Sequence, residues 1–324
     1  MPILENTFTP SFPFNIGHFN TIYRPLFVKD TINYQRKRIT TWDHDFLDLD
    51  FSFTGSTSIV VLIHGLEGSS QSSYMVTTSK KLNDEGFDTV CMNLRGCSGE
   101  DNLLLGTYHS GKTDDVDFVI NHLNNQYNYQ NIIIVGFSLG GNLTLKYLGE
   151  YNNIPSLVKG AVAVSVPIDL TTSQAELCKL KNKIYLTEFL KTMKTKLLQK
   201  AEKFPEFQLD KKLLLKATRF RHIEKQYTVP VFGFESSEDY WIKASSKPYI
   251  PNIKHTTLLI NALDDSFLSK ECYPYDEAQN IANFYLLTPD YGGHVGFLSS
   301  FSNAENTWLE EKIIHFIKDK VELC

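Results

Sequence analysis

Apolar and polar residues follow two different periods along the chain. Short apolar runs rich in β-branched residues, such as 58–63 and 131–135, have the length of buried strands. In 113–125 the apolar residues recur at helical spacing instead, and Thr113 is suited to cap that helix. These patterns predict strands near 38–42, 46–53, 58–63, 88–92, 131–135, 159–165, 257–262 and 283–288, and helices near 72–84, 113–125, 139–150, 270–282 and 304–320.

Strands and helices therefore alternate, which is typical of an α/β protein with a mostly parallel central sheet and helices on both faces. The first two strands are expected to form an antiparallel pair that joins this sheet. The interval between the sixth and seventh strands is far longer than one crossover helix needs, and its apolar residues have mostly helical spacing. We therefore expect an N-terminal segment at 1–57, a core at 58–170 and 250–324, and a helical cap inserted at 171–249.

A G-x-S-x-G pentapeptide at 136–140 lies between the predicted strand at 131–135 and the predicted helix at 139–150. Such a strand, tight turn and helix force the middle residue into strained backbone geometry and expose its hydroxyl at the end of the sheet. The flanking glycines relieve the crowding of the turn. The pentapeptide alone occurs often by chance, but this setting favours Ser138 as a nucleophile.

A nucleophilic serine needs a histidine to take its proton and a carboxylate to orient that histidine. In this kind of fold they follow the serine in the order acid, then histidine. Asp264 and Asp265 follow a short apolar strand; Asp265 is preferred because a small residue and two apolar residues come after it, and Asp264 stays the alternative. Among nine histidines, His294 has glycines on both sides, a predicted strand before it and a predicted helix after it.

The charge that develops on an attacked carbonyl oxygen needs hydrogen-bond donors. The backbone N–H of Leu139, the residue after the nucleophile, is one candidate, and that of Leu66, in the loop after the strand at 58–63, is the other. We interpret His64 as a residue that braces this loop rather than as a second base. His64, Phe137 and Phe189 are also candidates for the substrate pocket.

Several segments spread over most of the chain make it similar to the YheT-like branch of the α/β-hydrolases, which also includes eukaryotic monoacylglycerol lipases, phospholipases and yeast acyltransferases that form ethyl esters. These segments are PFNIGHFNT at 13–21, HGLEGSS at 64–70, NLRGCSG at 93–99, YHSGKTD at 108–114, GFSLGGNLTLKYLGE at 136–150, VSVPIDL at 164–170, NALDDSFL at 261–268 and YGGHVGF at 291–297. The resemblance implies an α/β-hydrolase fold and an acyl-ester substrate, with Ser138, Asp265 and His294 as the catalytic triad. It leaves open which ester is used and whether water or an alcohol receives the acyl group.

The predicted cap is basic. Residues 171–225 contain 14 Lys and Arg against 6 Asp and Glu, a net charge of +8, although the whole chain carries −5. A solvated helix face is the simpler interpretation of this lysine run. The sharper one is contact with an anionic lipid surface or an anionic acyl carrier, because clustered lysines are attracted to such surfaces.

Composition excludes several other classes. At 324 residues and 42% hydrophobic, the chain is long enough for one large α/β core with an insertion. No apolar run approaches the length of about 20 residues that spans a bilayer, and from the first residues we expect no secretion signal. The sequence contains no metal-binding motif such as H-E-x-x-H, and the D-H-D run at 43–45 fits a hairpin turn better than a ligand cluster. Five cysteines without a paired spacing indicate reduced thiols, so we expect a cytoplasmic protein. We also expect no cofactor, no bound metal and no nucleic-acid partner.

Two other functions remain as alternatives to a serine esterase. Residues 106–113 fit G-x-x-x-x-G-K-T, the phosphate-binding loop of nucleotide hydrolases, but only three apolar residues precede them where a buried strand is needed. A non-catalytic binding protein on the same scaffold is also conceivable from fold alone. The intact set of Ser138, Asp265 and His294 argues against it.

Overall fold

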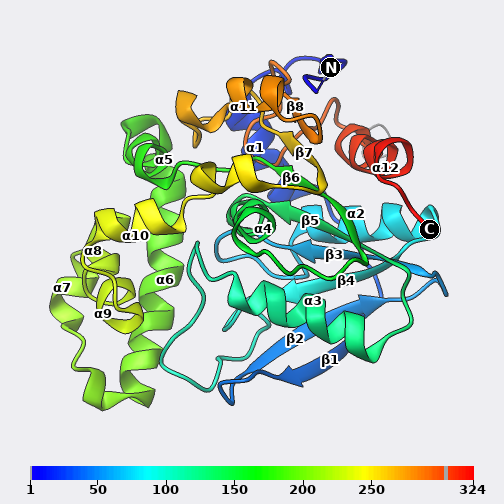
Figure 1. Ribbon diagram of the computed structural model, residues 1–324. Helices are drawn as coiled ribbons and strands as arrows, with labels where there is room; N and C mark the ends of the chain where they lie inside the picture. Colours follow the sequence, from blue (N-terminus) through cyan, green and yellow to red (C-terminus); the bar gives the residue numbers. More distant parts are fainter. Residues whose placement is uncertain (1, 303–305) are drawn as a thin grey trace.

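The computed structural model describes residues 2–302 and 306–324 and contains an eight-stranded sheet in the order β1-β2-β4-β3-β5-β6-β7-β8 (Figure 1). β2 runs antiparallel to both β1 and β4, and the other neighbouring strands are parallel, as predicted. The strands are β1 Gln35–Thr40, β2 Phe46–Ser52, β3 Ser58–Ile63, β4 Asp88–Asn93, β5 Asn131–Phe137, β6 Val158–Val164, β7 Thr256–Ile260 and β8 Phe284–Leu287.

Helices cover both faces of this sheet. On β3, Ile59, Val61 and Ile63 pack on one side with residues of α3, α4 and α11, whereas Val60 and Leu62 pack on the other side with residues of α2 and α12. Because successive side chains of a strand point to opposite faces, this alternation divides the core into two layers. The covering helices are α2 Ser73–Asp84, α3 Asp114–Gln126, α4 Leu139–Glu150, α11 Tyr275–Asn280 and α12 Trp308–Lys320.

The predicted helix at 270–282 is wrong in its extent. The chain forms a 3-10 turn, η4 Lys270–Cys272, and then the short α11, with Pro274 between them. Proline lacks an N–H and disfavours helical geometry in the residue before it, so one continuous helix cannot form there. The predicted helix at 304–320 corresponds to α12, and its first two residues, Ala304 and Glu305, lie outside the described residues.

An N-terminal helix, α1 Gly17–Phe27, was not predicted. It begins inside the segment 13–21 that carries part of the family resemblance. Gly17 packs so closely on the loop after β7 that a Cβ atom there would lie 2.4 Å from the carbonyl oxygen of Asp264. The first helix therefore lies against the loop that carries the candidate acids.

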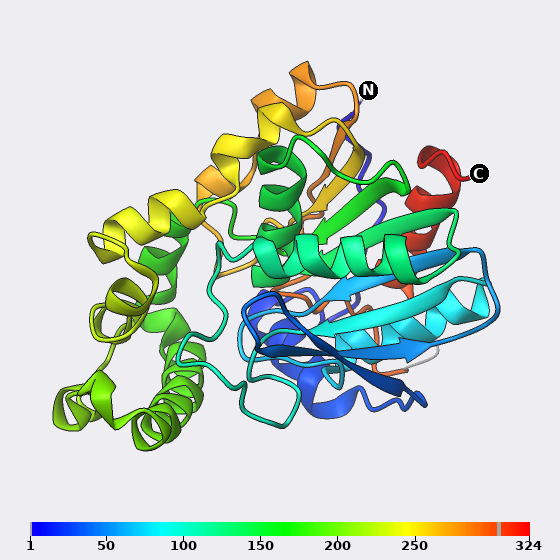
Figure 2. The ribbon, with the colours of Figure 1, turned by 60° about the horizontal axis from the view of Figure 1, so that its bottom comes forward.

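The long insertion between β6 and β7 is mostly helical, and Figure 1 and Figure 2 both show its helices gathered on one side of the sheet. Its own apolar cluster includes Leu190, Leu197 and Ile223. The elements are α5 Leu170–Leu177, η1 Leu180–Asn182, α6 Lys183–Lys203, η2 Pro205–Phe207, α7 Lys211–Leu215, α8 Phe220–Glu224, α9 Thr228–Phe232, α10 Ser237–Ala244 and η3 Lys247–Asn252.

The lysines of α6 do not form one solvated face. Lys196 pairs with Glu67 at 3.0 Å, and Lys200, with a side chain only 1% exposed, pairs with Asp101 at 2.9 Å. Lys200 also donates to the carbonyl oxygen of Leu104 at 2.6 Å. These lysines tie the insertion to loops of the core, which corrects the simpler interpretation for this part of the helix. Within the described residues, no helix is both long and apolar enough for a membrane span.

Candidate active site

Ser138 lies at the turn between β5 and α4. Its φ of 53° and ψ of −117° are strained for a residue with a side chain. The turn is so tight that a Cβ atom on Gly136 would lie 2.4 Å from the carbonyl oxygen of Gly140, and one on Gly140 would lie 2.2 Å from that of Ile63. The sequence therefore needs glycine at both flanking positions, and the strained turn presents the serine hydroxyl.

The structure brings Ser138, His294 and Asp265 together in one chain of hydrogen bonds. Nε2 of His294 lies 2.9 Å from Oγ of Ser138, and Nδ1 lies 2.8 Å from Oδ2 of Asp265. The side chain of Asp265 is fully buried, whereas that of His294 is 10% exposed. Because a carboxylate oxygen only accepts hydrogen bonds, Nδ1 of His294 carries the hydrogen that faces Asp265, which leaves Nε2 to accept the serine proton.

Asp264, the alternative acid, has a different environment. Its Oδ1 accepts a hydrogen bond from the backbone N–H of Gly293 at 2.8 Å, and its Oδ2 has no partner among the described residues. Burial, together with the charge of Asp265, raises the pKa of this carboxyl to about 6 against the opposing effect of the hydrogen bond from Gly293. Asp264 therefore contacts the backbone of the histidine loop, and its neighbour contacts the imidazole.

Three residues that position His294 were missed by the sequence analysis. The Thr21 hydroxyl accepts from the backbone N–H of His294, and the Ser165 hydroxyl accepts from that of Val295, at 2.8 and 2.9 Å. The Phe267 ring stacks on the imidazole with centroids 4.2 Å apart. Thr21 and Ser165 lie in segments of the family resemblance, 13–21 and 164–170, which was the available signal for them.

The two expected oxyanion donors flank the serine. Leu139 begins α4, so its backbone N–H has no acceptor within that helix. In the loop after β3, the N–H groups of Gly65, Glu67 and Gly68 donate to Tyr74, Tyr108 and Gly65, whereas the N–H of Leu66 has no acceptor among the described residues. The sheet register places Ile63 beside Gly136, so the two loops leave the sheet as neighbours.

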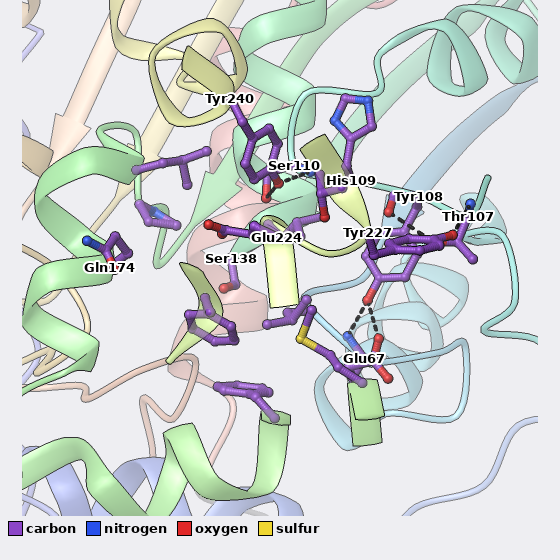
Figure 3. Close-up of a pocket in the computed structure, with 18 of the residues that line it drawn as sticks. Glu67, Thr107, Tyr108, His109, Ser110, Ser138, Gln174, Glu224, Tyr227 and Tyr240 are labelled. Carbon is purple, nitrogen blue, oxygen red and sulfur yellow. Dashed lines mark hydrogen bonds between the residues drawn. The ribbon is translucent and has the colours of Figure 1, made fainter. Parts of the chain in front are cut away.

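A cavity begins at Ser138 and His294 and continues beneath the helical insertion (Figure 3). Leu66, Leu139 and Phe189 line it. The insertion contributes further apolar and aromatic side chains to the wall: Leu170, Leu177, Met193, Leu197, Phe220, Tyr227, Tyr240 and Trp241. The space beside the serine hydroxyl is thus suited to an apolar ligand.

His64 and Phe137 are not part of the cavity wall, which corrects the expectation that they contribute to the pocket. Both are completely buried. His64 Nδ1 lies 2.8 Å from the carbonyl oxygen of Gly65, and its Nε2 accepts from the N–H of Leu94 at 3.1 Å. Burial lowers the pKa of His64 to about 4, so the ring is neutral and braces two loops. Phe137 packs in the core against Tyr74.

The segment 106–113 does not have the setting of a phosphate-binding loop. It follows irregular chain rather than a strand, and Lys112 is paired with Asp114 at 2.8 Å. Tyr108, His109 and Ser110 of this segment line the cavity instead. Residues 2–302 and 306–324 also contain no group of three or more His, Cys, Asp or Glu side chains arranged to hold a metal ion.

Comparison with known proteins agrees with this architecture. The alpha/beta hydrolase fold family matches residues 58–300. YheT of Escherichia coli is 31% identical, covering 97% of this chain and 94% of its own length, and human phospholipase ABHD3 is 28% identical, covering 99% and 81%. The structure of an esterase from Pyrococcus furiosus has the same fold, with a TM-score of 0.62 at 18% identity over 90% of this chain and 92% of the other. The chain therefore belongs to the alpha/beta hydrolase fold family and, within it, to the branch that contains YheT.

Proposed function

We propose that the protein is a serine esterase that cleaves acyl esters through an acyl-enzyme intermediate. The observation that carries this proposal is the continuous hydrogen-bond chain from Ser138 through His294 to the buried Asp265, with Ser138 and His294 in the wall of a cavity that has many apolar side chains. Its components have the order and geometry of a nucleophile, a general base and an orienting acid.

In the proposed mechanism, Ser138 Oγ attacks the ester carbonyl carbon while His294 Nε2 takes the hydroxyl proton. The backbone N–H groups of Leu66 and Leu139 stabilise the oxyanion. His294 then returns the proton to the leaving alcohol, and Asp265 keeps the imidazole in the required tautomer throughout. A water molecule or a second alcohol, activated by the same histidine, releases the acyl group, so acyl transfer is part of the proposal.

The proposed substrate is an ester with an apolar acyl chain, such as a lipid ester. The apolar walls that Phe189, Met193 and Leu197 contribute to the cavity support it, and a phospholipase is among the relatives. A peripheral contact with anionic lipid would involve exposed cap lysines such as Lys191, whose side chain is 73% exposed. A cytoplasmic location belongs to the same proposal and rests on the five unpaired cysteines.

Two measurements test the proposal together. The wild-type protein should hydrolyse p-nitrophenyl esters with a clear optimum in acyl length, and a fluorophosphonate probe should label it on Ser138. Ser138→Ala should abolish both while leaving the melting temperature within a few degrees. Labelling of the variant at the wild-type rate would assign the nucleophile to another serine. ATP binding at micromolar affinity that is lost in Lys112→Ala would support the nucleotide alternative.

A further inference from the structure

A buried acid lies in the wall of the cavity and takes no part in the proposed chemistry. Glu224, at the end of α8, is only 7% exposed, and Figure 3 shows its side chain among the residues that line the cavity with Ser138. Its Oε1 accepts from the indole N–H of Trp241 at 2.9 Å. Its Oε2 is buried and has no hydrogen bond within the described residues.

The other acids of the cavity wall are satisfied by neighbours. Glu67 accepts from the Tyr108 hydroxyl at 2.6 Å and pairs with Lys196, and Asp101 pairs with Lys200. Glu224 has no ion pair in the part of the chain that the structure describes. A buried carboxylate oxygen without a partner costs free energy, and such groups persist where they serve a ligand.

The arginine nearest to Glu224 in the chain does not supply an ion-pair partner. Arg221 lies on the same helix but pairs with the exposed Glu238. The Ser237 hydroxyl lies close enough to lower the pKa of Glu224 as a hydrogen-bond donor does, although neither this hydroxyl nor Oε2 has a hydrogen bond of ordinary geometry within the described residues. Burial dominates and raises the pKa of Glu224 to about 7, with Glu238 adding to the rise and Arg221 opposing it.

We propose that Glu224 binds a hydroxyl group of the substrate at a distance from the ester bond. The inference rests on the proposed esterase function and deepens it: the preferred ester carries a hydroxyl on its acyl or alcohol part. Phe220, Tyr240 and Trp241 line the cavity with Glu224 and hold the apolar part of the ligand. A hydroxyl can donate to a carboxylate or accept from a carboxylic acid, so it pairs with either form of Glu224. It also loses less solvation on burial than a cation does.

The test compares matched esters. One pair consists of p-nitrophenyl esters of equal chain length with and without a terminal hydroxyl, and the other of hydroxyalkyl and alkyl esters of one acid. In one of the pairs, Glu224→Leu should reduce the kcat/KM ratio of hydroxylated to plain ester by about 10–100-fold, the range for a hydrogen bond to a charged group. Glu224→Gln, which keeps an acceptor, should retain part of the ratio. If Glu224→Leu leaves the kcat/KM ratio unchanged in both pairs of esters, the proposal is wrong.

Control variants separate binding from structural support. Gln174 lines the same cavity from α5, and Gln174→Leu should leave the kcat/KM ratio of hydroxylated to plain ester unchanged. Trp241→Phe removes the indole donor but not the carboxylate, so it should keep the preference for the hydroxyl. If it instead reproduces Glu224→Leu, Glu224 acts only by positioning Trp241, and the proposal is wrong. A wild-type preference for a terminal trimethylammonium over a hydroxyl, lost in Glu224→Gln, would likewise overturn it in favour of a cation site.

Failure of this inference is distinguishable from failure of the esterase proposal. If the protein labels with fluorophosphonate and cleaves plain esters but the ratio does not depend on Glu224, only the hydroxyl site is wrong. If no ester is cleaved and no label is incorporated, the esterase proposal itself fails. Melting temperatures accompany each variant, because Glu224→Leu removes a buried acid but also leaves the indole N–H of Trp241 without its acceptor.

Discussion

Asp264 and Asp265 are neighbours in the chain, yet their carboxylates contact different parts of the same loop. Oδ2 of Asp265 lies 2.8 Å from Nδ1 of His294, and Oδ1 of Asp264 lies 2.8 Å from the backbone nitrogen of Gly293. One acid is therefore placed to fix the tautomer of the imidazole, and the other holds the backbone before it. The two contacts predict separable effects of substitution.

Asp265→Asn should lower kcat for ester hydrolysis by about 10⁴-fold, because an amide no longer fixes the histidine tautomer. Asp264→Asn should cost less than about tenfold, since an amide oxygen can still accept from Gly293. Steady-state kinetics with one p-nitrophenyl ester checks both variants. The reverse ranking would move the orienting role to Asp264.

Asp264 should also make stability depend on pH. Its pKa is raised from 3.8 to about 6 in the folded protein, so between these values the folded state holds more protons than the unfolded state. The contribution of Asp264 to the free energy of unfolding therefore falls as the pH rises through this range. Asp264→Asn lacks this loss, so its stability relative to wild type should improve from about pH 4 to about pH 7.

Urea unfolding of both proteins at the two pH values measures the difference. Asp169→Asn is a matched control, because this half-buried acid caps α5 and lies outside the histidine loop. A constant difference between wild type and Asp264→Asn at the two pH values would show that Asp264 does not carry the effect.

The buried lysine of α6 gives a prediction about the attachment of the insertion. Lys200→Met removes one donor from Asp101 and from the carbonyl oxygens of Asn102 and Leu104. Each of these acceptors keeps a second partner, which is Lys203 for Asp101 and Asn102 and the Asn102 amide for Leu104. Breaking a fully buried pair costs about 3–5 kcal/mol. Asp101 is 37% exposed and can regain water, so we expect a smaller loss of about 2–3 kcal/mol.

Chemical denaturation checks this value, with Lys191→Met as the control. Lys191 lies on the same helix with a side chain 73% exposed, so its replacement should change the free energy of unfolding by no more than about 0.5 kcal/mol. Equal effects of the two substitutions would mean that the contacts of Lys200 do not hold the insertion.

The sequence predicted the elements whose signals are local. The apolar run of β5, the flanking glycines and α4 together defined the position of Ser138, because periodicity and turn chemistry act within a few residues. The mostly parallel sheet followed from the alternation of strands with helices, whereas the order of the strands within it was not predicted. Asp265 was separable from Asp264 only by its following residues, and the structure gives each acid a distinct partner.

Features that depend on contacts between distant segments were not predictable in this way. Thr21 bonds to His294 across 273 positions, and no local pattern indicates such a contact. The sequence His-Gly after a strand is the same whether the histidine side chain faces a pocket or the core, so the burial of His64 could not be predicted from it. Likewise, a lysine run does not reveal that Lys200 turns inward to meet the loop at Asp101.

Phe189 connects the insertion to the catalytic histidine proposed above. Its ring lies 6.3 Å from that of Phe267, which stacks on His294, and it lines the cavity. Phe189→Ala should therefore shift the preferred acyl length towards longer or bulkier chains. The activation free energies of two esters, compared through their kcat/KM values, should change relative to each other by about 1–3 kcal/mol per methylene-sized difference. A series of p-nitrophenyl esters of increasing length measures this shift.

Leu190, the next residue of α6, is the matched control. It is 5% exposed and belongs to the apolar cluster of the insertion without lining the cavity. Leu190→Ala should cost about 2–5 kcal/mol of stability and leave the length profile unchanged, because the lost contacts are those of an ordinary core residue. The two substitutions should thus have different effects: Phe189→Ala alters the selectivity for acyl length, and Leu190→Ala lowers the stability. If Phe189→Ala instead lowers stability as Leu190→Ala does and keeps the wild-type length profile, the face of α6 at Phe189 serves packing rather than acyl binding.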